Sequence, residues 1–286
     1  MANNSNNLSD HVMPWSNLQG KVVLVTGASS GFGWDFSINL AKAGCKVIAA
    51  ARRLDRLRSL CQLINNFQSS SCNTPLAVPL ELDITAHPAV IEAAVQEAWR
   101  VFGHIDVLIN NAGITGSTTT TLKLNEEEWD RVFKINLTGA WLCSKNIGLR
   151  MRGAGRGGSI INISSAFGLN RGKATGSLAY SSSKAALHTL TTVMAVEFAE
   201  YSIRVNAIAP TIFRSEITKA LYDKKWLPRV LDKLVPMRSL YDATVDPSLT
   251  ELVRYLIHGS SKYVTGNIFI VDGGNTLSGI PIWSSL

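Results

Sequence analysis

Short apolar, β-branched runs alternate with longer stretches of helical periodicity along almost all of the 286 residues. The runs predict strands buried on both faces, because they stay apolar at consecutive positions and not only at every second one. They lie at residues 21–26, 46–51, 77–82, 106–110, 159–164, 203–208 and 267–271. Helical patterns lie between them at residues 33–44, 54–66, 88–102, 126–150 and 179–201. This alternation predicts an α/β fold, a doubly wound parallel sheet of about seven strands with helices on both faces, in a single domain.

The two ends of the chain and one long connection depart from the alternation. We expect residues 1–18 to form a flexible N-terminal segment, residues 19–276 the folded domain and residues 277–286 a C-terminal tail. Residues 210–247 contain helical fragments and no predicted strand. Connections of that length in compact domains are usually functional, so we expect this one to cover a substrate.

Charge and hydropathy exclude several classes of protein. The 28 Lys and Arg against 21 Asp and Glu give a net charge of +7, and the 46% of hydrophobic residues excludes intrinsic disorder. Basic clusters interleaved with aromatic residues are absent, so no nucleic-acid partner is predicted. No sequence window approaches a membrane span and the first residues resemble no targeting peptide, which predicts a cytoplasmic protein without a membrane partner. The four cysteines lie far apart and predict no metal site.

A glycine-rich turn, T-G-A-S-S-G-F-G, follows the first predicted strand and opens the first predicted helix. Such glycines let backbone N–H groups approach a pyrophosphate, to which the helix N-terminus adds a partial positive charge. The second strand ends at Ala51 and is followed by Arg52 and Arg53, without the carboxylate that would hold a ribose 2′-hydroxyl. We therefore predict NADP(H) as cofactor, with Arg52 as the main phosphate partner and Arg53 as helper or alternate. The other interpretation is a pair of solvated arginines at a helix start.

Tyr180 and Lys184 are four residues apart in a helical stretch, which puts them on one face of a helix. A free phenol has a pKa of about 10, and an adjacent ammonium stabilises the phenolate and lowers that pKa toward neutrality. Ser165 follows a predicted strand at the open end of the sheet, where its hydroxyl could hydrogen-bond a substrate carbonyl oxygen. The three residues predict general acid/base chemistry at a carbonyl or an alcohol.

In their order along the chain these motifs resemble the short-chain dehydrogenase/reductase family, from about residue 21 to residue 274. The chain also resembles plant members loosely named after 3-oxoacyl carrier-protein reductases, which are often recruited into specialised metabolism. The matching positions are Thr26, Gly27, Gly31, Gly33, Asp83, Asn110, Asn111, Ala112, Gly113, Asn136, Ser165, Tyr180, Lys184, Pro210 and the closing V-T-G-N-I-F-I-V-D-G-G. The resemblance implies a Rossmann fold, a homodimer or homotetramer, and hydride transfer between nicotinamide and a carbonyl or secondary alcohol.

The resemblance also implies a role for each matched residue. Tyr180 would be the general acid/base and Lys184 its pKa-lowering partner, while Ser165 would orient the carbonyl and Asn136 would hold a proton-relay water. The cofactor residues would be Gly27, Ser29, Ser30, Gly31, Phe32, Gly33, Arg52, Arg53, Asp83, Ile84, Asn110, Ala112, Gly113, Tyr180, Lys184, Pro210, Thr211 and Ile212. The substrate residues would be Ser165, Phe167, Tyr180, Phe213 and Trp226.

Two positions depart from the family pattern. Phe32 stands where a small aliphatic residue normally precedes the last glycine of the loop, and Thr211 stands where glycine usually follows Pro210. A β-branched residue resists positive φ, so we expect the turn at Thr211 to differ. Both changes bear on the nicotinamide pocket and on the range of substrates.

Three functions remain open at this point. The first is NADPH-dependent reduction of a small hydrophobic ketone, or the reverse oxidation of an alcohol. The second is reduction of 3-oxoacyl groups bound to a carrier protein or to CoA. The third is a cofactor-binding protein without redox turnover, which senses a ligand or guides a non-redox cyclisation. The final Ser284, Ser285 and Leu286 are similar to the peroxisomal Ser-Lys-Leu signal, which makes a peroxisomal location the alternative to a cytoplasmic one.

Overall fold

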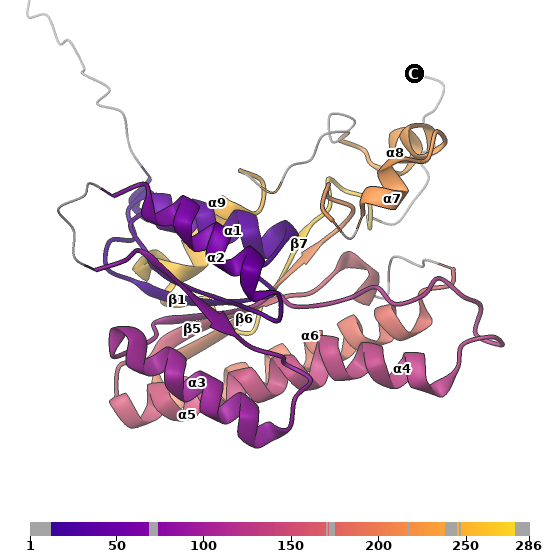
Figure 1. Ribbon diagram of the computed structural model, residues 1–286. Helices are drawn as coiled ribbons and strands as arrows, with labels where there is room; N and C mark the ends of the chain where they lie inside the picture. Colours follow the sequence, from indigo (N-terminus) through magenta and orange to yellow (C-terminus); the bar gives the residue numbers. More distant parts are fainter. Residues whose placement is uncertain are drawn as a thin grey trace, which may run out of the picture.

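The computed structural model describes residues 13–68, 74–169, 171, 175–216, 218–237, 245 and 247–277. Its centre is a seven-stranded parallel sheet with the order β3-β2-β1-β4-β5-β6-β7 (Figure 1). The strands are β1 (Val22–Thr26), β2 (Lys46–Ala51), β3 (Ala77–Glu81), β4 (Val107–Asn110), β5 (Gly158–Ile163), β6 (Ile203–Pro210) and β7 (Ile268–Val271). The predicted doubly wound α/β fold is confirmed.

Helices cover both faces of the sheet, as Figure 1 shows. One layer contains α1 (Gly31–Lys42), α2 (Leu54–Asn65) and α9 (Thr250–Ile257), and the other contains α3 (Pro88–Phe102), α4 (Glu126–Phe133), α5 (Ala140–Ala154) and α6 (Leu178–Phe198). Successive side chains of a strand point to opposite faces, so β1 supplies both cores. Val23 and Val25 enter the core under α1, and Val22 and Leu24 enter the core under α5. All four are fully buried, which explains the continuous apolar runs of the sequence.

The helical stretch predicted at residues 126–150 is interrupted. A wider turn of π type at Lys134–Gly139 separates α4 from α5 and carries Asn136 into the interior, where it is 1% exposed. Gly139 lies against Ile84, since a Cβ at this glycine would be 2.8 Å from the Ile84 Cδ1 atom. Apolar periodicity runs through the turn without a break, so the pattern alone predicted one helix.

Residues 13–18, the described part of the expected flexible N-terminal segment, pack against the domain. The Trp15 ring meets Tyr255 of α9 edge-on at 5.5 Å, and Leu18 is 3% exposed in the core. Residues 1–12 and 278–286 lie outside the described part of the chain, and with them the tripeptide on which the peroxisomal alternative depends. Within the described residues, no helix has the length and apolar character needed to cross a membrane.

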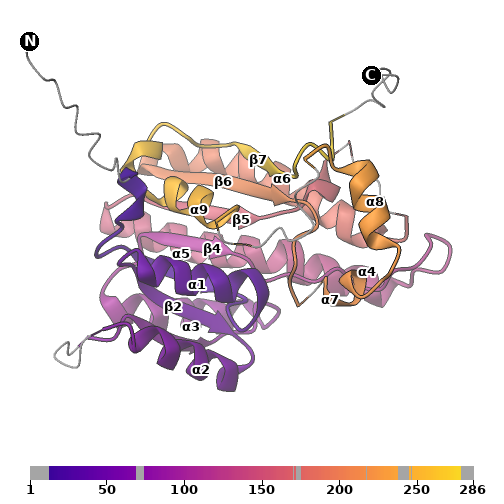
Figure 2. The same cartoon turned by 90° about the horizontal axis from the view of Figure 1, so that it is seen from above.

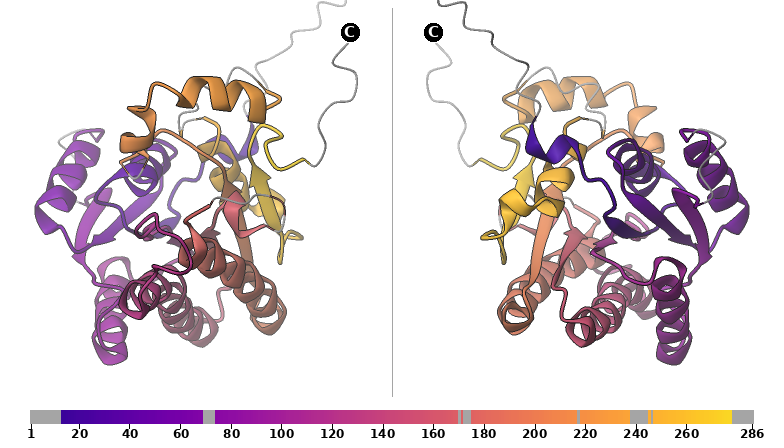
Figure 3. Two further views of the ribbon diagram at one scale, coloured as in Figure 1. Left: turned by 90° about the vertical axis from the view of Figure 1, so that its right-hand side faces the viewer. Right: turned by 90° about the vertical axis from the view of Figure 1, so that its left-hand side faces the viewer.

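The strand order reverses between β1 and β4, and in such sheets ligands bind at the carboxyl ends of the strands beside this reversal. The connection after β6 forms α7 (Lys219–Tyr222) and α8 (Leu227–Leu234). Figure 2 shows both helices beyond the carboxyl end of β6, and Figure 3 shows this orange segment above the sheet. This is the place in which a substrate-covering segment was expected.

Candidate active site

The predicted cofactor residues gather at the carboxyl edge of the sheet. Gly27 to Gly33 follow β1, Arg52 and Arg53 follow β2, Asp83 and Ile84 follow β3, Asn110 to Gly113 follow or end β4, and Pro210 to Ile212 end or follow β6. Segments that are far apart in the sequence therefore meet beside one loop, the glycine-rich turn at the start of α1.

Two glycines of this loop allow a very close approach of the backbone. Gly27 has φ +68°, and a Cβ there would be 2.8 Å from the Ala112 Cα. A Cβ at Gly33 would be 2.5 Å from the Asn111 Nδ2 and 2.6 Å from the Gly27 carbonyl oxygen. Asn111 also donates from Nδ2 to the Thr26 carbonyl oxygen at 2.9 Å, which joins the loop to the end of β4. The loop is thus packed tightly against the end of β4.

Replacing Gly33 by alanine is expected to destabilise the loop, because the methyl group must displace Asn111 and a backbone carbonyl. We expect a loss of about 1–3 kcal/mol in the free energy of unfolding, together with weaker binding of the dinucleotide. Thermal unfolding and cofactor titration measure the two effects. Gly153→Ala is the matched control, since a Cβ there meets nothing within 4 Å. Equal stability of the two variants would show that the loop tolerates a side chain.

The two arginines after β2 have different surroundings. Arg53 donates from Nε to the Ser29 hydroxyl at 3.1 Å and from Nη2 to the Ser30 hydroxyl at 2.7 Å. Arg52 lies near Asp83. Burial raises the pKa of Asp83, but hydrogen bonds from Thr85 and the charge of Arg52 outweigh burial and hold it below its usual value. The sequence ranked Arg52 first as phosphate partner; in the structure Arg53 is the arginine that is hydrogen-bonded to the glycine-rich turn.

Tyr180, Ser165 and Lys184 come together beside the ends of β5 and α6. The Ser165 hydroxyl is hydrogen-bonded to the Tyr180 phenol and also accepts from the Phe167 backbone N–H at 3.2 Å. The latter bond starts a short 3-10 turn, Ala166–Gly168. Lys184 lies one helical turn beyond Tyr180, 4% exposed, with Nζ 5.9 Å from the centre of the phenol ring. The predicted group of three residues is therefore assembled.

Burial acts on the pKa values of both Tyr180 and Lys184. Burial raises the pKa of the phenol, and the Ser165 hydrogen bond that lowers it does not compensate. The Lys184 ammonium donates to the Ile163 carbonyl oxygen at 2.8 Å, and burial lowers its own pKa to about 8. Burial of the phenol thus outweighs the Ser165 hydrogen bond, and the lowering of the Tyr180 pKa expected from Lys184 stays a prediction.

Asn136 and Asn110 both brace the loop and strands around the site. The Asn136 amide donates to the Ile114 carbonyl oxygen at 2.9 Å and to the Ser183 hydroxyl at 3.0 Å, while its oxygen accepts from the Ile114 N–H at 2.9 Å. Asn110 donates to Ser144 and Asn162 at 2.8 Å each, which ties β4 to α5 and β5. Both N–H groups of the Asn136 amide are thus engaged by protein.

Ser164 and Ser165 are neighbours with separate partners. The Ser164 hydroxyl lies 2.7 Å from the Nε2 atom of His188 and donates to the Lys184 carbonyl oxygen at 3.3 Å. Burial, and then the charge of Lys184, lower the pKa of His188 to about 4, so the imidazole is neutral near pH 7. Ser164 is therefore engaged in packing β5 on α6, and Ser165 alone of the pair contacts the Tyr180 phenol.

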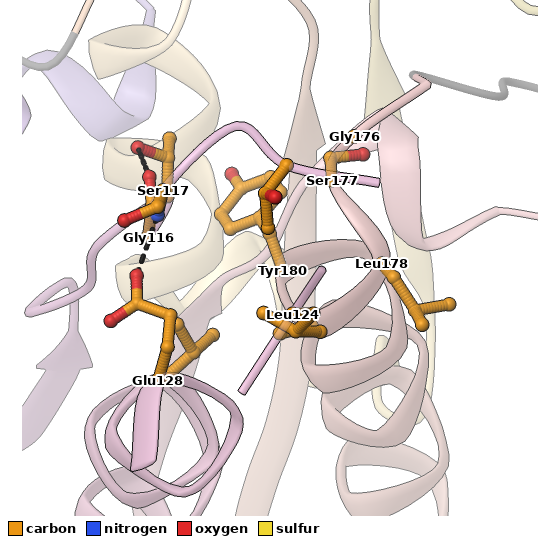
Figure 4. Close-up of a pocket in the computed structure, with 12 residues that line it drawn as sticks. Gly116, Ser117, Leu124, Glu128, Gly176, Ser177, Leu178 and Tyr180 are labelled. Atoms are coloured by element: carbon orange, nitrogen blue, oxygen red, sulfur yellow. Dashed lines mark hydrogen bonds between the residues drawn. The ribbon is translucent and has the colours of Figure 1, made fainter. Parts of the chain in front are cut away.

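A pocket beside Tyr180 contains residues that the sequence analysis did not single out (Figure 4). It is formed by the loop after β4, by α4 and by the start of α6. The Ser117 backbone N–H donates to Glu128 at 2.6 Å. The hydrogen-bonded ion pair with Arg131, and to a smaller extent the bond from Ser117, lower the pKa of Glu128 to about 2. Thr119 donates from its backbone N–H to the Gly176 carbonyl oxygen at 3.0 Å. The T-G-S-T-T-T run after β4 was the available signal, since glycine and short hydroxyl residues favour an ordered turn.

The predicted substrate residues separate into different environments. Phe213 is 2% exposed and packs edge-on against Phe32 with 6.0 Å between ring centres, so it belongs to the core under α1. Trp226 is 51% exposed at the start of α8, and Phe167 is half-buried in the turn after Ser165. Phe32, the bulky departure from the family pattern, is accommodated by this contact with Phe213.

Thr211, the other departure, is also accommodated. Its backbone N–H donates to the Val271 carbonyl oxygen at 3.1 Å, and its hydroxyl accepts from Asn275 Nδ2 at 3.0 Å. Among the described residues other than glycine, Ser202 is the one with positive φ, so Thr211 forms its turn without the conformation that glycine would allow. The turn above the carboxyl edge is thereby joined to the C-terminal end of the domain.

A doubly wound sheet with a glycine-rich loop, and with a serine, a tyrosine and a lysine brought together beside it, defines a dinucleotide-dependent oxidoreductase. The chain belongs to the short-chain dehydrogenase family, whose model, described as short chain dehydrogenase, matches residues 21–226. It is 32% identical to a 2-dehydro-3-deoxy-D-gluconate 5-dehydrogenase from Dickeya dadantii over 90% of this chain and 96% of that protein.

Solved structures agree with this family. A gluconate 5-dehydrogenase from Burkholderia cenocepacia, in complex with NADP and tartrate, superposes with a TM-score of 0.84 at 27% identity, over 93% of this chain and 99% of that one. A 3-ketoacyl-(acyl-carrier-protein) reductase from Brucella melitensis, complexed with NADH, gives 0.78 at 28% identity, over 91% and 100%.

Proposed function

We propose that this protein is an NADP(H)-dependent oxidoreductase that reduces a small hydrophobic ketone, or oxidises the corresponding secondary alcohol. The observation that carries the proposal is the hydrogen bond between Ser165 and Tyr180, with Lys184 on the same helix face behind the phenol. A phenol held by a hydroxyl and a buried ammonium is suited to exchange a proton with a carbonyl oxygen.

The described residues fit a bound dinucleotide. The loop at Gly27 and Gly33 leaves no room for side chains against the sheet, while a Cβ at Gly31 would meet no atom closer than 3.7 Å. Arg53, Ser29 and Ser30 offer hydrogen-bond donors for a phosphate beside this loop. When bound, the nicotinamide would supply or accept the hydride.

The chain's own residues would then handle the proton. In the direction of reduction, Tyr180 donates its phenolic proton to the substrate oxygen while Ser165 holds that oxygen by a second hydrogen bond. Lys184 stabilises the phenolate that remains, because its ammonium is kept next to the ring by the Ile163 carbonyl oxygen. The substrate part of the proposal is supported by two exposed apolar side chains, Leu178 at the start of α6 and Trp226 at the start of α8, which are 40% and 51% exposed.

The second candidate is reduction of 3-oxoacyl groups on an acidic carrier protein or on CoA. The segment that covers the carboxyl edge is rich in cations, with Lys219, Lys224, Lys225, Arg229 and Lys233 against Asp223 and Asp232. A basic rim attracts an acidic partner and raises its rate of association. The 3-ketoacyl reductase among the similar structures supports the same candidate.

One assay separates the candidates. NADPH oxidation, followed by absorbance, is measured with a panel of free ketones and with acyl groups bound to carrier protein and to CoA. Turnover of free hydrophobic ketones supports the first candidate, and a preference for carrier-bound substrates that weakens with salt supports the second. Binding of NADPH without turnover of any member of the panel would instead favour the non-redox alternative.

We expect the two arginines to set the preference for NADPH. Arg53→Ala should raise the KM for NADPH by about tenfold and leave the KM for NADH almost unchanged, because a charge-assisted contact with one phosphate is lost. Arg52→Ala should have the smaller effect, since Arg52 lies near Asp83. Steady-state kinetics with both cofactors test this. A wild-type preference for NADH would contradict the cofactor assignment.

We also propose that the protein is a homodimer or homotetramer. Trp141 on α5 is 43% exposed, and Val193 and Val196 on α6 are 50% and 79% exposed. Exposed apolar side chains on two neighbouring helices are typical of subunit interfaces. Light scattering at micromolar concentration should report two or four times the mass of 31.0 kDa. A monomer would contradict the proposal.

A further inference from the structure

Glu216 joins the substrate-covering segment to the phosphate-binding region. Its carboxylate accepts from both terminal nitrogens of Arg53, at 3.3 and 3.2 Å, and from Nη1 of Arg56 at 3.2 Å. Ser30 also hydrogen-bonds this carboxylate. The Glu216 carboxylate therefore binds Arg53 and Ser30, the same two side chains that the proposed dinucleotide site offers to a phosphate.

The backbone beneath Glu216 is held in place above the glycine-rich loop. A Cβ at Gly31 would lie 3.7 Å from the Ser215 Cβ and 4.0 Å from the Glu216 backbone nitrogen, so the segment passes directly over the start of α1. Phe213 anchors the same segment in the core. Ser215 is tied further along by its N–H, which donates to the Thr218 hydroxyl at 2.9 Å. The position of the carboxylate follows from these anchors.

The charge of Glu216 is retained over the whole working range. Hydrogen bonds from Arg53 and Ser30 lower its pKa to about 2, so the group is an anion near neutral pH. The side chains of Glu216, Arg53 and Arg56 are 45%, 43% and 46% exposed, which leaves the cluster open to an incoming solute. A carboxylate and a phosphate oxygen compete for the same guanidinium donors.

We propose that Glu216 is a specificity-determining residue, a built-in anion that occupies the 2′-phosphate subsite on Arg53 and weakens binding of 2′-phosphorylated nucleotides relative to unphosphorylated ones. This inference rests on the proposed dinucleotide site. A phosphate that reaches Arg53 must displace the carboxylate or lie beside it as a like charge. A nucleotide with a free 2′-hydroxyl leaves the Glu216 contacts intact.

The test uses nucleotide fragments that need no catalysis. Dissociation constants of adenosine 2′,5′-bisphosphate and of 5′-ADP are measured by calorimetry for the wild type, Glu216→Gln and Glu216→Ala. Both variants should bind the 2′-phosphorylated fragment about fivefold more tightly and 5′-ADP unchanged, the size expected when one exposed ionic contact no longer competes. Glu251→Gln is the control, because Glu251 pairs with Arg254 at 3.0 Å on α9, outside this cluster.

The outcomes separate this inference from the proposed function. Weaker binding of the 2′-phosphorylated fragment by both variants, or an equal change for both fragments, would overturn the inference and show that Glu216 only ties the segment down. Failure of the wild type to bind either fragment would refute both the dinucleotide site and the inference. If the wild type prefers NADH but the variants gain affinity for the 2′-phosphorylated fragment, the inference stands and the proposed cofactor is wrong.

Discussion

Replacing Tyr180 by phenylalanine is expected to lower kcat by about 10²–10⁴-fold, the usual contribution of a positioned general acid. Phenylalanine keeps the ring in its place between α6 and the pocket but has no proton to give. The Ser165 hydroxyl loses its phenol partner and keeps the Phe167 N–H, so the local turn should persist. Steady-state turnover of a ketone with NADPH measures the effect.

Cofactor binding distinguishes a chemical role of Tyr180 from a structural one. The dissociation constant for NADPH and the thermal midpoint of Tyr180→Phe should match those of the wild type. Tyr263→Phe is the matched control, since Tyr263 is 97% exposed. Turnover by Tyr180→Phe within a few-fold of the wild type would remove this residue from the proposed acid/base role.

Replacing Lys184 by methionine is expected to abolish most turnover and at the same time to stabilise the protein at pH 7. Lys184 is 4% exposed, and no carboxylate forms an ion pair with it among the described residues. Its hydrogen bond to the Ile163 carbonyl oxygen only partly offsets the desolvation of the ammonium. Methionine fills similar space without a charge. We expect a gain of roughly 1–3 kcal/mol in the free energy of unfolding.

The pH dependence of that gain has a definite sign. The pKa of Lys184 is lowered from 10.5 to about 8, so between these values the unfolded chain binds more protons than the folded one. Wild-type stability therefore rises with pH in this window, and the advantage of Lys184→Met should shrink from pH 8 upward. Denaturant unfolding at pH 7 and pH 10 measures it, with exposed Lys145→Met as the control. A variant that is less stable than the wild type at pH 7 would show that the ammonium contributes net stability.

Most of the fold could be predicted because a parallel sheet covered on both faces leaves continuous apolar runs. The π-type turn at Lys134–Gly139 could not, because its apolar residues continue the helical spacing on either side. The helix at Thr250–Ile257 was not predicted, because its eight residues are too few to show a clear helical period between the covering segment and β7. Boundaries and breaks of this kind depend on contacts with distant elements.

The candidate site was predictable where the chemistry requires a residue type at a fixed spacing, as for Tyr180 and Lys184. Arg52 and Arg53 could not be ranked, because their side-chain directions depend on Ser29 and Ser30 in another segment. Phe213 illustrates the same limit. An apolar residue in a covering segment can face the ligand or the core, and here Phe213 packs against the Phe32 ring in the core.

The π-type turn before α5 also changes which way two successive helices face. Each residue of an α-helix turns the chain by about 100°, so an inserted residue rotates everything after it relative to everything before it. This phase change lets Val132 of α4 pack under the loop at Gly116 while Cys143 of α5 lies in the sheet core. A single straight helix would have to give up one of the two surfaces. The extra residue separates the part of the helix that supports the loop beside Tyr180 from the part that packs on the sheet.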